Sequence, residues 1–165
     1  MLLTVLRILA FLLGTAIVIG TLFSAVETFV LPRSAPDPLT GFVFRVIRKV
    51  FDRAIRLRHQ YYARDRIMAF YAPVAVLSLL PVWLALVLFG FMGMFWAIDA
   101  GSLYAAFRAS GSSLLTLGFE TAPGLPRSLL AFSEATIGLI LVALLIAYLP
   151  TMYAAFSRRE AAVAL

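Results

Sequence analysis

The sequence predicts an all-α integral membrane protein with three transmembrane helices, a short re-entrant helix and an amphipathic interfacial helix. Composition is the first observation behind this fold class. Of the 165 residues, 63% are hydrophobic and 13% are charged, and the mean hydropathy of +1.00 lies far outside the range of soluble domains. The second observation is that three stretches carry no charged residue, at 8–26, 67–98 and 135–157. Each approaches or exceeds the roughly 20 residues that a helix needs to cross a hydrocarbon core.

The first span belongs to residues 1–32. Arg7 followed by an apolar run also has the form of a secretory signal peptide. We disfavour that alternative because FSA at 23–25 is a poor small-residue cleavage site, and because cleavage would place the basic segment that follows outside the cell. Residues 1–32 are therefore predicted to be an N-terminal transmembrane helix, in which Gly14 and Gly20 allow close packing on a neighbouring helix.

The charges of residues 33–66 predict the topology. Nine basic residues are opposed there by three aspartates, and the positive-inside rule makes such a segment cytoplasmic. The N-terminus and the link between the second and third spans are then outside. The C-terminal tail, which carries Arg158 and Arg159, is inside. We expect a multi-pass protein of the cell (inner) membrane.

An amphipathic helix is predicted within this basic segment. Asp37-Pro38 and Thr40 are start signals, and apolar residues recur at helical spacing from Val43 to Leu57. A basic amphipathic helix beside a span lies in the membrane interface, held by apolar burial and by anionic lipids. Nucleic-acid binding is the rival interpretation of the pI near 10.3, and we reject it because topology alone requires such a charge cluster. The residues predicted to contact lipid are Arg45, Arg48, Lys49, Arg53 and Arg56.

The second span, 67–98, is too long for a straight crossing. Its 32 residues make a helix of about 48 Å, so it must tilt, kink or protrude from the bilayer. Pro73 and Pro81 offer kinks. Trp96, near the outer end, suits the aromatic belt, whereas Trp83 is predicted to pack inside the protein.

A short helix is predicted between the second and third spans. Ser102 can cap it, and 103–115 then gives three to four turns, about half of what a crossing needs. A short helix that enters the membrane from outside must turn back, and 116–123 returns the chain to the third span. Irregular backbone at membrane depth is tolerated only where it is buried in protein or lines a water-filled path. Its carbonyl groups therefore need a partner, and a dehydrated cation is one.

From the second span onward the chain resembles the pore module of the potassium channel superfamily, in its bacterial form of two helices and one pore loop. The resemblance rests on a span, a short helix, the residues Thr116-Leu117-Gly118-Phe119, a proline and a final span. The family filter reads TVGYG and is followed by an acidic residue. The matched module is 67–159, with an outer helix at 67–98, a pore helix at 103–115, a filter at 116–120 and an inner helix at 128–157. Residues 160–165 then start a cytoplasmic tail.

The resemblance implies a homotetrameric channel that conducts cations passively. Carbonyl groups of Thr116, Leu117, Gly118 and Phe119 from four copies would replace the hydration shell of K⁺, or of Na⁺. Gly118 matches the first filter glycine, which must reach backbone angles that other residues resist. No cofactor is implied, and no metal site beyond the permeant monovalent cations.

The TLGFE filter departs from the family pattern. Glu120 stands where the second glycine belongs or, after a one-residue deletion, where the acidic residue belongs. Pro123 supports the deletion, because it lies one position closer to Thr116 than the family pattern places its proline. Either alignment loses one glycine, so we expect weakened potassium selectivity. A ring of four Glu120 carboxylates would concentrate cations at the outer mouth.

Five residues of the final helix are further candidates. Glu134 is predicted to support the filter through a hydrogen bond to its back or to a neighbouring chain, with a carboxylate at headgroup level as the alternative. Gly138 and Pro150 are candidate bends of a gate, with Leu145 or Leu149 as its apolar constriction. Packing of a small residue explains Gly138 equally well.

Enzymatic function is not predicted. His59 is the only histidine and there is no cysteine, so no nucleophile, base and orienting group can be assembled. A secondary transporter is disfavoured because three spans show no internal repeat. The alternative to a channel is a non-conducting membrane interaction or regulatory subunit built on a channel-like module. In that case the filter, which lacks one glycine and carries Glu120, passes no ions.

Overall fold

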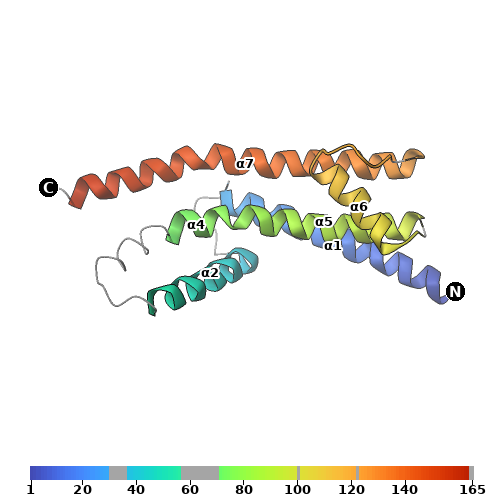
Figure 1. Cartoon of the computed structure of the whole chain (residues 1–165), viewed down its shortest axis with the longest axis horizontal. Coiled ribbons are helices and arrows are strands. Elements are labelled where there is room, and N and C mark those ends of the chain that lie inside the picture. The colour runs from blue at the N-terminus through green and yellow to red at the C-terminus, as the bar shows by residue number, and fades with distance from the viewer. Residues whose placement is uncertain (30–36, 57–70, 100, 122, 164–165) are drawn as a thin grey trace. The chain divides into compact units, whose positions relative to one another are not determined.

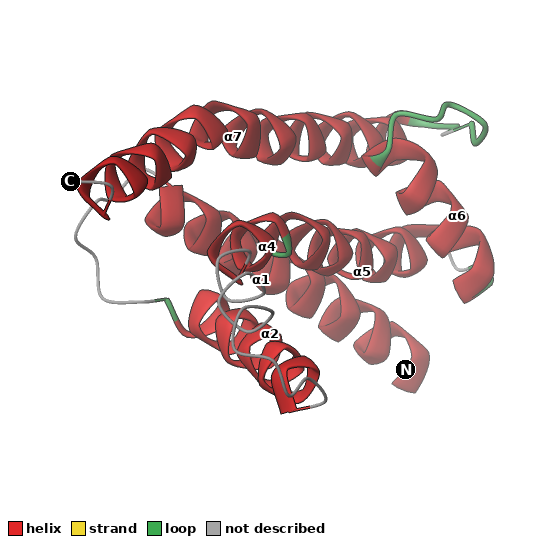
Figure 2. Ribbon diagram, turned by 60° about the vertical axis from the view of Figure 1, so that its left-hand side comes forward, coloured by secondary structure: helices red, strands yellow, loops and turns green. Residues whose placement is uncertain are grey.

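The computed structural model describes residues 1–29, 37–56, 71–99, 101–121 and 123–163. The described chain is helical, without a strand (Figures 1 and 2). This confirms the all-α fold class. In chain order the helices are α1 (Leu2–Phe29), α2 (Pro38–Arg56), α4 (Tyr71–Leu77), α5 (Leu79–Asp99), α6 (Leu103–Leu114) and α7 (Leu125–Val163).

Among the described residues, three helical segments are long and apolar enough to cross a membrane: Leu2–Phe29, Pro73–Asp99 and Leu125–Pro150. They correspond to the three predicted spans and support a multi-pass membrane protein. The re-entrant position of α6, the interfacial position of α2 and the orientation of the termini remain predictions.

The second span is interrupted close to one of its two prolines. α4 ends at Leu77 and α5 begins at Leu79. Pro81 lacks the backbone N–H that would bond to the carbonyl group of Leu77 four residues earlier, and its ring crowds that carbonyl. The Ser78 hydroxyl donates to the carbonyl oxygen of Val74 at 2.6 Å. Proline chemistry thus accounts for the break between α4 and α5.

Packing divides the chain into two units, and the first contains Met1–Ala25 and Val82–Ala143. In it α1 and α5 run antiparallel and approach closely where both carry glycine. A Cβ atom on Gly14 would lie 2.3 Å from the carbonyl oxygen of Gly90, and one on Gly93 would lie 3.2 Å from that of Ala10. The predicted packing role of Gly14 is confirmed. That of Gly20 is wrong within this chain, since nothing lies within 4 Å of the site of its Cβ.

Trp83 packs in this first unit, as predicted. Its side chain is fully buried, and its indole N–H donates to the Ser24 hydroxyl of α1 at 3.2 Å. The hydroxyl satisfies the one polar group of a large apolar side chain. This bond adds a polar contact to the α1–α5 interface formed around Gly14.

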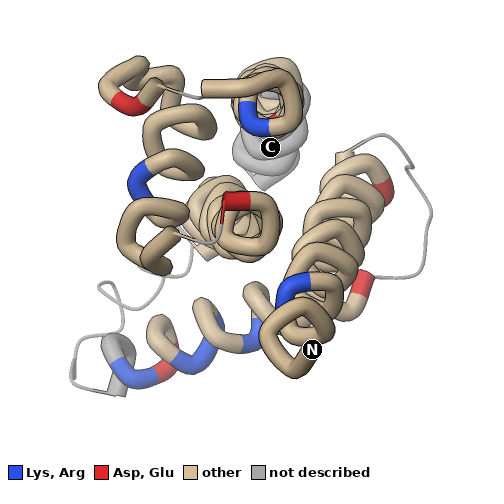
Figure 3. Tube along the Cα trace, turned by 90° about the vertical axis from the view of Figure 1, so that its right-hand side faces the viewer, with Lys and Arg blue, Asp and Glu red and all other residues tan. Residues whose placement is uncertain are grey.

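The second unit, Val26–Pro81 with Leu144–Leu165, contains α2 and α4. Asp37 caps α2, because its Oδ2 accepts from the backbone N–H of Thr40 at 3.1 Å. The Tyr71 hydroxyl of α4 donates to the carbonyl oxygen of Phe44 at 3.2 Å, and its ring meets Phe51 edge-on at 5.6 Å. Part of the apolar face of α2 therefore packs on α4. Figure 3 shows basic residues recurring along α2.

Candidate functional site

α6 is a short helix with a defined start. Ser102 adopts an extended conformation, and its hydroxyl accepts from the backbone N–H of Ala105 at 3.1 Å. The helix thus begins at the predicted residue. It ends at Leu114, one residue before the predicted end. Its twelve residues span about 18 Å, which is too short to cross a bilayer.

Two other helices hold α6 in place within the first unit. Ser110 of α6 is fully buried, and its Oγ lies 2.9 Å from the carbonyl oxygen of Leu88 in α5 and 2.5 Å from Oε1 of Glu134 in α7. The end of α6 also touches α7, since a Cβ atom on Gly138 would lie 2.7 Å from the carbonyl oxygen of Leu114. Figure 2 shows α6 reaching from α5 to α7.

These contacts involve two residues of α7 that were singled out from the sequence, Glu134 and Gly138. Glu134 has no exposed surface, and its partner is the Ser110 hydroxyl of the predicted pore helix. Its support of the filter and its position at headgroup level both stay predictions. Gly138 is required by packing, because a side chain would strike the backbone of Leu114. α7 continues as a helix through Gly138 and Pro150.

The loop after α6 has an unusual backbone. Leu115 has φ −90°, Thr116 has φ 53° and Gly118 has φ 72°, while Leu117 is not among the residues with positive φ. The sign of φ therefore alternates over four residues. An L-residue such as Thr116 avoids this region, and no local pattern predicts the positive φ at this position. The positive φ expected at Gly118 is observed.

The N–H groups of Thr116 and Leu117 bond to α6, whereas the carbonyl groups of residues 116–119 do not bond to the described chain. Thr116 and Leu117 donate their backbone N–H to the carbonyl oxygens of Ser113 and Ser112, at 3.1 and 2.9 Å. No hydrogen bond among the described residues ends on the carbonyl oxygens of residues 116–119. Alternating handedness turns successive N–H groups to one side, and the carbonyl groups of trans peptides then face away from it.

Glu120 is held by α6 rather than left free. Its Oε1 lies 2.8 Å from Nη2 of Arg108, with the two side chains 28% and 44% exposed. Its backbone N–H donates to the Ser112 hydroxyl at 3.1 Å, and the Arg108 guanidinium lies 5.5 Å from the ring centre of Phe119. Arg108 offsets the charge of Glu120, so the expected ring of free carboxylates at the mouth is weaker than the sequence predicts.

A second ion pair fixes the start of α7. Nη1 of Arg127 lies 2.7 Å from Oδ2 of Asp99 at the end of α5. Two ion pairs therefore hold the chain between α6 and α7. The Arg108–Glu120 pair ties the loop to α6, and the Arg127–Asp99 pair ties the start of α7 to the end of α5. Arg108, Ser110 and Ser112 were missed from the sequence. Arg108 carried a usable signal, because it is the one charged residue between Asp99 and Glu120.

The remaining predicted residues lie elsewhere. Leu145 is buried, and Leu149 and Pro150 are exposed, all within the second unit. Of the predicted lipid contacts, the side chains of Arg45, Arg48, Lys49 and Arg53 are exposed on α2. The side chain of Arg56 and all of His59 fall outside the described part of the chain. Among the described residues no group of three or more His, Cys, Asp or Glu could hold a metal ion.

Comparison with models of protein families, with curated proteins and with solved structures finds no match to this chain. The described residues of the single chain do not show a pore-loop fold. The resemblance to potassium channels therefore stays a prediction, and the residues that support it are those of α6 and the loop that follows it.

Proposed function

We propose that four copies of this chain form a cation channel of the potassium channel type, with the carbonyl groups of Thr116, Leu117, Gly118 and Phe119 as its ion-binding groups. One observation carries the proposal. Four consecutive carbonyl oxygens follow a half-length helix between two spans, and none accepts a hydrogen bond from the described chain. Unsatisfied carbonyl groups at membrane depth are costly, and a permeating cation satisfies them.

The contacts of α6 favour this function over a plain extracellular turn. A turn needs no anchoring, yet Ser110 of this helix is tied to both flanking spans and Glu120 is clamped by Arg108. A filter needs such rigidity, because its carbonyl groups must keep their positions while ions pass. The C-terminal end of α6 carries the negative end of its dipole, which favours a cation nearby.

Selectivity for K⁺ over Na⁺ is proposed to be weak. Thr116 and Gly118 keep the inner part of the family filter, but the second glycine is missing. An ion site at the outer end therefore lacks its usual backbone. The charge of Glu120, offset by Arg108, contributes less cation attraction than a free carboxylate would.

α2 is proposed to lie in the membrane interface. Its exposed basic residues, Arg45, Arg48, Lys49 and Arg53, occupy one side. Phe42, Val46 and Val50 remain exposed, so apolar surface is left over after α4 has covered part of the helix. Such a helix binds anionic lipid by apolar burial and by charge.

The test is ion flux into liposomes under opposed K⁺ and Na⁺ gradients, with two glycine variants. Gly118 and Gly124 both have positive φ, 72° and 87°, and neither has a neighbour within 4 Å of the site of a Cβ. Alanine therefore strains both positions alike, by about 1–2 kcal/mol. We expect flux in the parent and in Gly124→Ala, and loss or altered selectivity in Gly118→Ala.

The outcomes separate the two candidate functions. Equal flux in all three proteins would show that Gly118 is not part of an ion path. Absence of flux from the parent, with a tetramer verified by mass, would favour the non-conducting interaction or regulatory subunit.

A further inference from the structure

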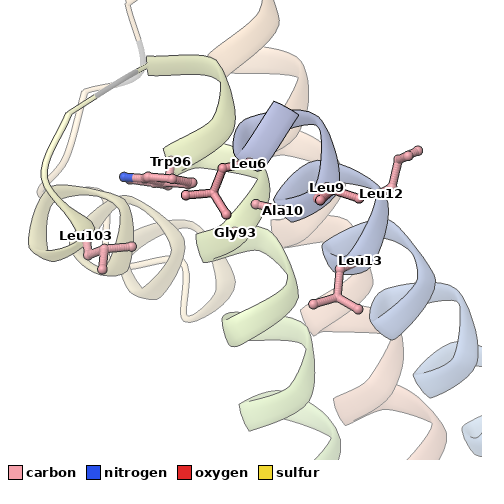
Figure 4. Close-up of a pocket in the computed structure, with 8 residues that line it drawn as sticks. All are labelled: Leu6, Leu9, Ala10, Leu12, Leu13, Gly93, Trp96 and Leu103. Carbon is pink, nitrogen blue, oxygen red and sulfur yellow. The ribbon is translucent and has the colours of Figure 1, made fainter. Parts of the chain in front are cut away.

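An apolar groove lies on the first unit, away from the loop after α6. It is lined by residues of α1 between Leu6 and Leu13, by Gly93 and Trp96 of α5, and by Leu103 at the start of α6, with a volume of about 770 Å³. Figure 4 shows Trp96 lying between Leu6 and Leu103. Gly93 helps to form the groove because it carries no side chain.

The groove lies along membrane-spanning helix. Every lining residue is apolar, and Trp96 contributes the one polar side-chain group, its indole N–H. The α1 residues from Ile8 onward belong to the charge-free run of the first span, which places them in hydrocarbon. An unfilled space there would forfeit dispersion contacts with its walls, and the surrounding medium supplies acyl chains.

Arg7 adds a cation at the end of the groove. It follows the lining residue Leu6 and precedes Ala10 by three positions, so on a helix it adjoins both. It also stands immediately before the charge-free run, where the headgroup region is expected. Its Nε is buried without a hydrogen-bond partner in the described chain, and no ion pair of the described residues includes it. A guanidinium without a charged partner at this depth is costly, and a phosphate group is its matching partner.

We propose that this groove binds one acyl chain of an anionic phospholipid, whose phosphate group contacts Arg7. A helix of a second copy fits less well. With its side chains a helix is about 10–12 Å across. An acyl chain is thin and flexible enough to follow the Leu6–Leu13 wall. The unpaired charge of Arg7 selects an anionic headgroup over a zwitterionic one.

The site has a built-in reporter. Trp96 lines the groove, whereas Trp83, the other tryptophan of the chain, is fully buried. The full-length protein is placed in vesicles that contain either dibrominated phosphatidylglycerol or dibrominated phosphatidylcholine, and quenching of tryptophan fluorescence is measured against the mole fraction of brominated lipid. Trp96→Phe gives the background from Trp83.

Three variants test the assignment. Arg7→Gln removes the charge. Leu13→Phe narrows the groove, and Ile19→Phe is its matched control, because both positions are exposed on α1 but Ile19 does not line the groove. We expect the parent to favour the anionic lipid about fivefold, as one basic residue near a lipid surface does. Arg7→Gln should abolish the preference, Leu13→Phe should weaken quenching by both lipids, and Ile19→Phe should match the parent.

Two results would overturn the proposal. Equal quenching by both lipids in the parent, unchanged in Arg7→Gln, would remove the headgroup contact. Quenching of Trp96 by neither lipid would mean that protein covers the groove, as a second copy of the chain would. Neither result depends on ion conduction, so the groove and the proposed channel stand or fall separately.

Discussion

Replacing Gly14 with valine should separate α1 from α5. A Cβ atom at this position would lie 2.3 Å from the carbonyl oxygen of Gly90, whereas ordinary contact begins at 3.4 Å. The obstacle is backbone and cannot rotate away, so the two helices must move apart by about 1 Å or more. Overpacking of this kind costs about 1–3 kcal/mol, which shifts the equilibrium between docked and separated helices about 5- to 150-fold.

Gly20→Val is the matched control for this prediction. Gly20 lies in the same helix, six residues further on, and nothing lies within 4 Å of the site of its Cβ. The two variants therefore share the intrinsic effect of valine on a helix and differ only in the contact with α5. A difference in helix separation between the two variants therefore reports the close contact of α1 with α5 at Gly14.

The native chain has no cysteine, which makes cross-linking a clean assay. The Thr15 hydroxyl lies 3.3 Å from the sulfur of Met94, so Thr15→Cys with Met94→Cys places two thiols across the interface for a short bifunctional reagent. We expect rapid cross-linking in this background and with Gly20→Val, and slow cross-linking with Gly14→Val. Equal rates in Gly14→Val and the background would refute the close crossing and the packing drawn from it.

Three further predictions concern α6 and its contacts. Glu134→Gln keeps the side-chain volume and a polar group near α6, so it should change the free energy of unfolding in a detergent titration by less than about 1 kcal/mol. Glu134→Ala leaves a cavity and should lower the free energy of unfolding by about 2–5 kcal/mol. Similar losses in both variants would count against the tight packing around Glu134. Arg108→Gln exposes the charge of Glu120 and should raise cation flux at low salt but not at high salt, and an increase at both would point to another cause. Ser102→Ala should cost about 1 kcal/mol of capping and speed amide exchange in the first turn of α6, while Ser113→Ala, which loses only a bond to its own helix, should leave that turn unchanged.

The positions of the helices followed from local sequence chemistry. Charge-free length marked the three spans, since the cost of burying charge in hydrocarbon acts on each segment by itself. Asp37 and Ser102 marked the starts of α2 and α6, because a cap acts on N–H groups two or three residues away. Pro73 and Pro81 were both candidate kinks of the second span, and the described helix is interrupted only near Pro81.

The partners of polar residues did not follow from the sequence. The sequence allows Glu134 to meet the back of the filter, a neighbouring chain or the headgroup region, and only the fold brings it to Ser110, 24 positions earlier. The sequence predicts a free charge at Glu120, because nothing local pairs it with Arg108, which lies twelve residues earlier within α6. Gly14 and Gly20 were indistinguishable as glycines in one span, and only the approach of Gly90 separates them.

The sequence by itself thus determined a helical membrane protein with three spans, a basic amphipathic segment and a half-length helix, because hydropathy, charge, caps and prolines all act within a few residues. Tertiary structure decided which polar groups meet: Ser110 with Glu134, Arg108 with Glu120, and Gly14 with Gly90. These contacts join helices that lie far apart in the chain. They depend on how the helices rotate and cross, and no local pattern encodes that geometry.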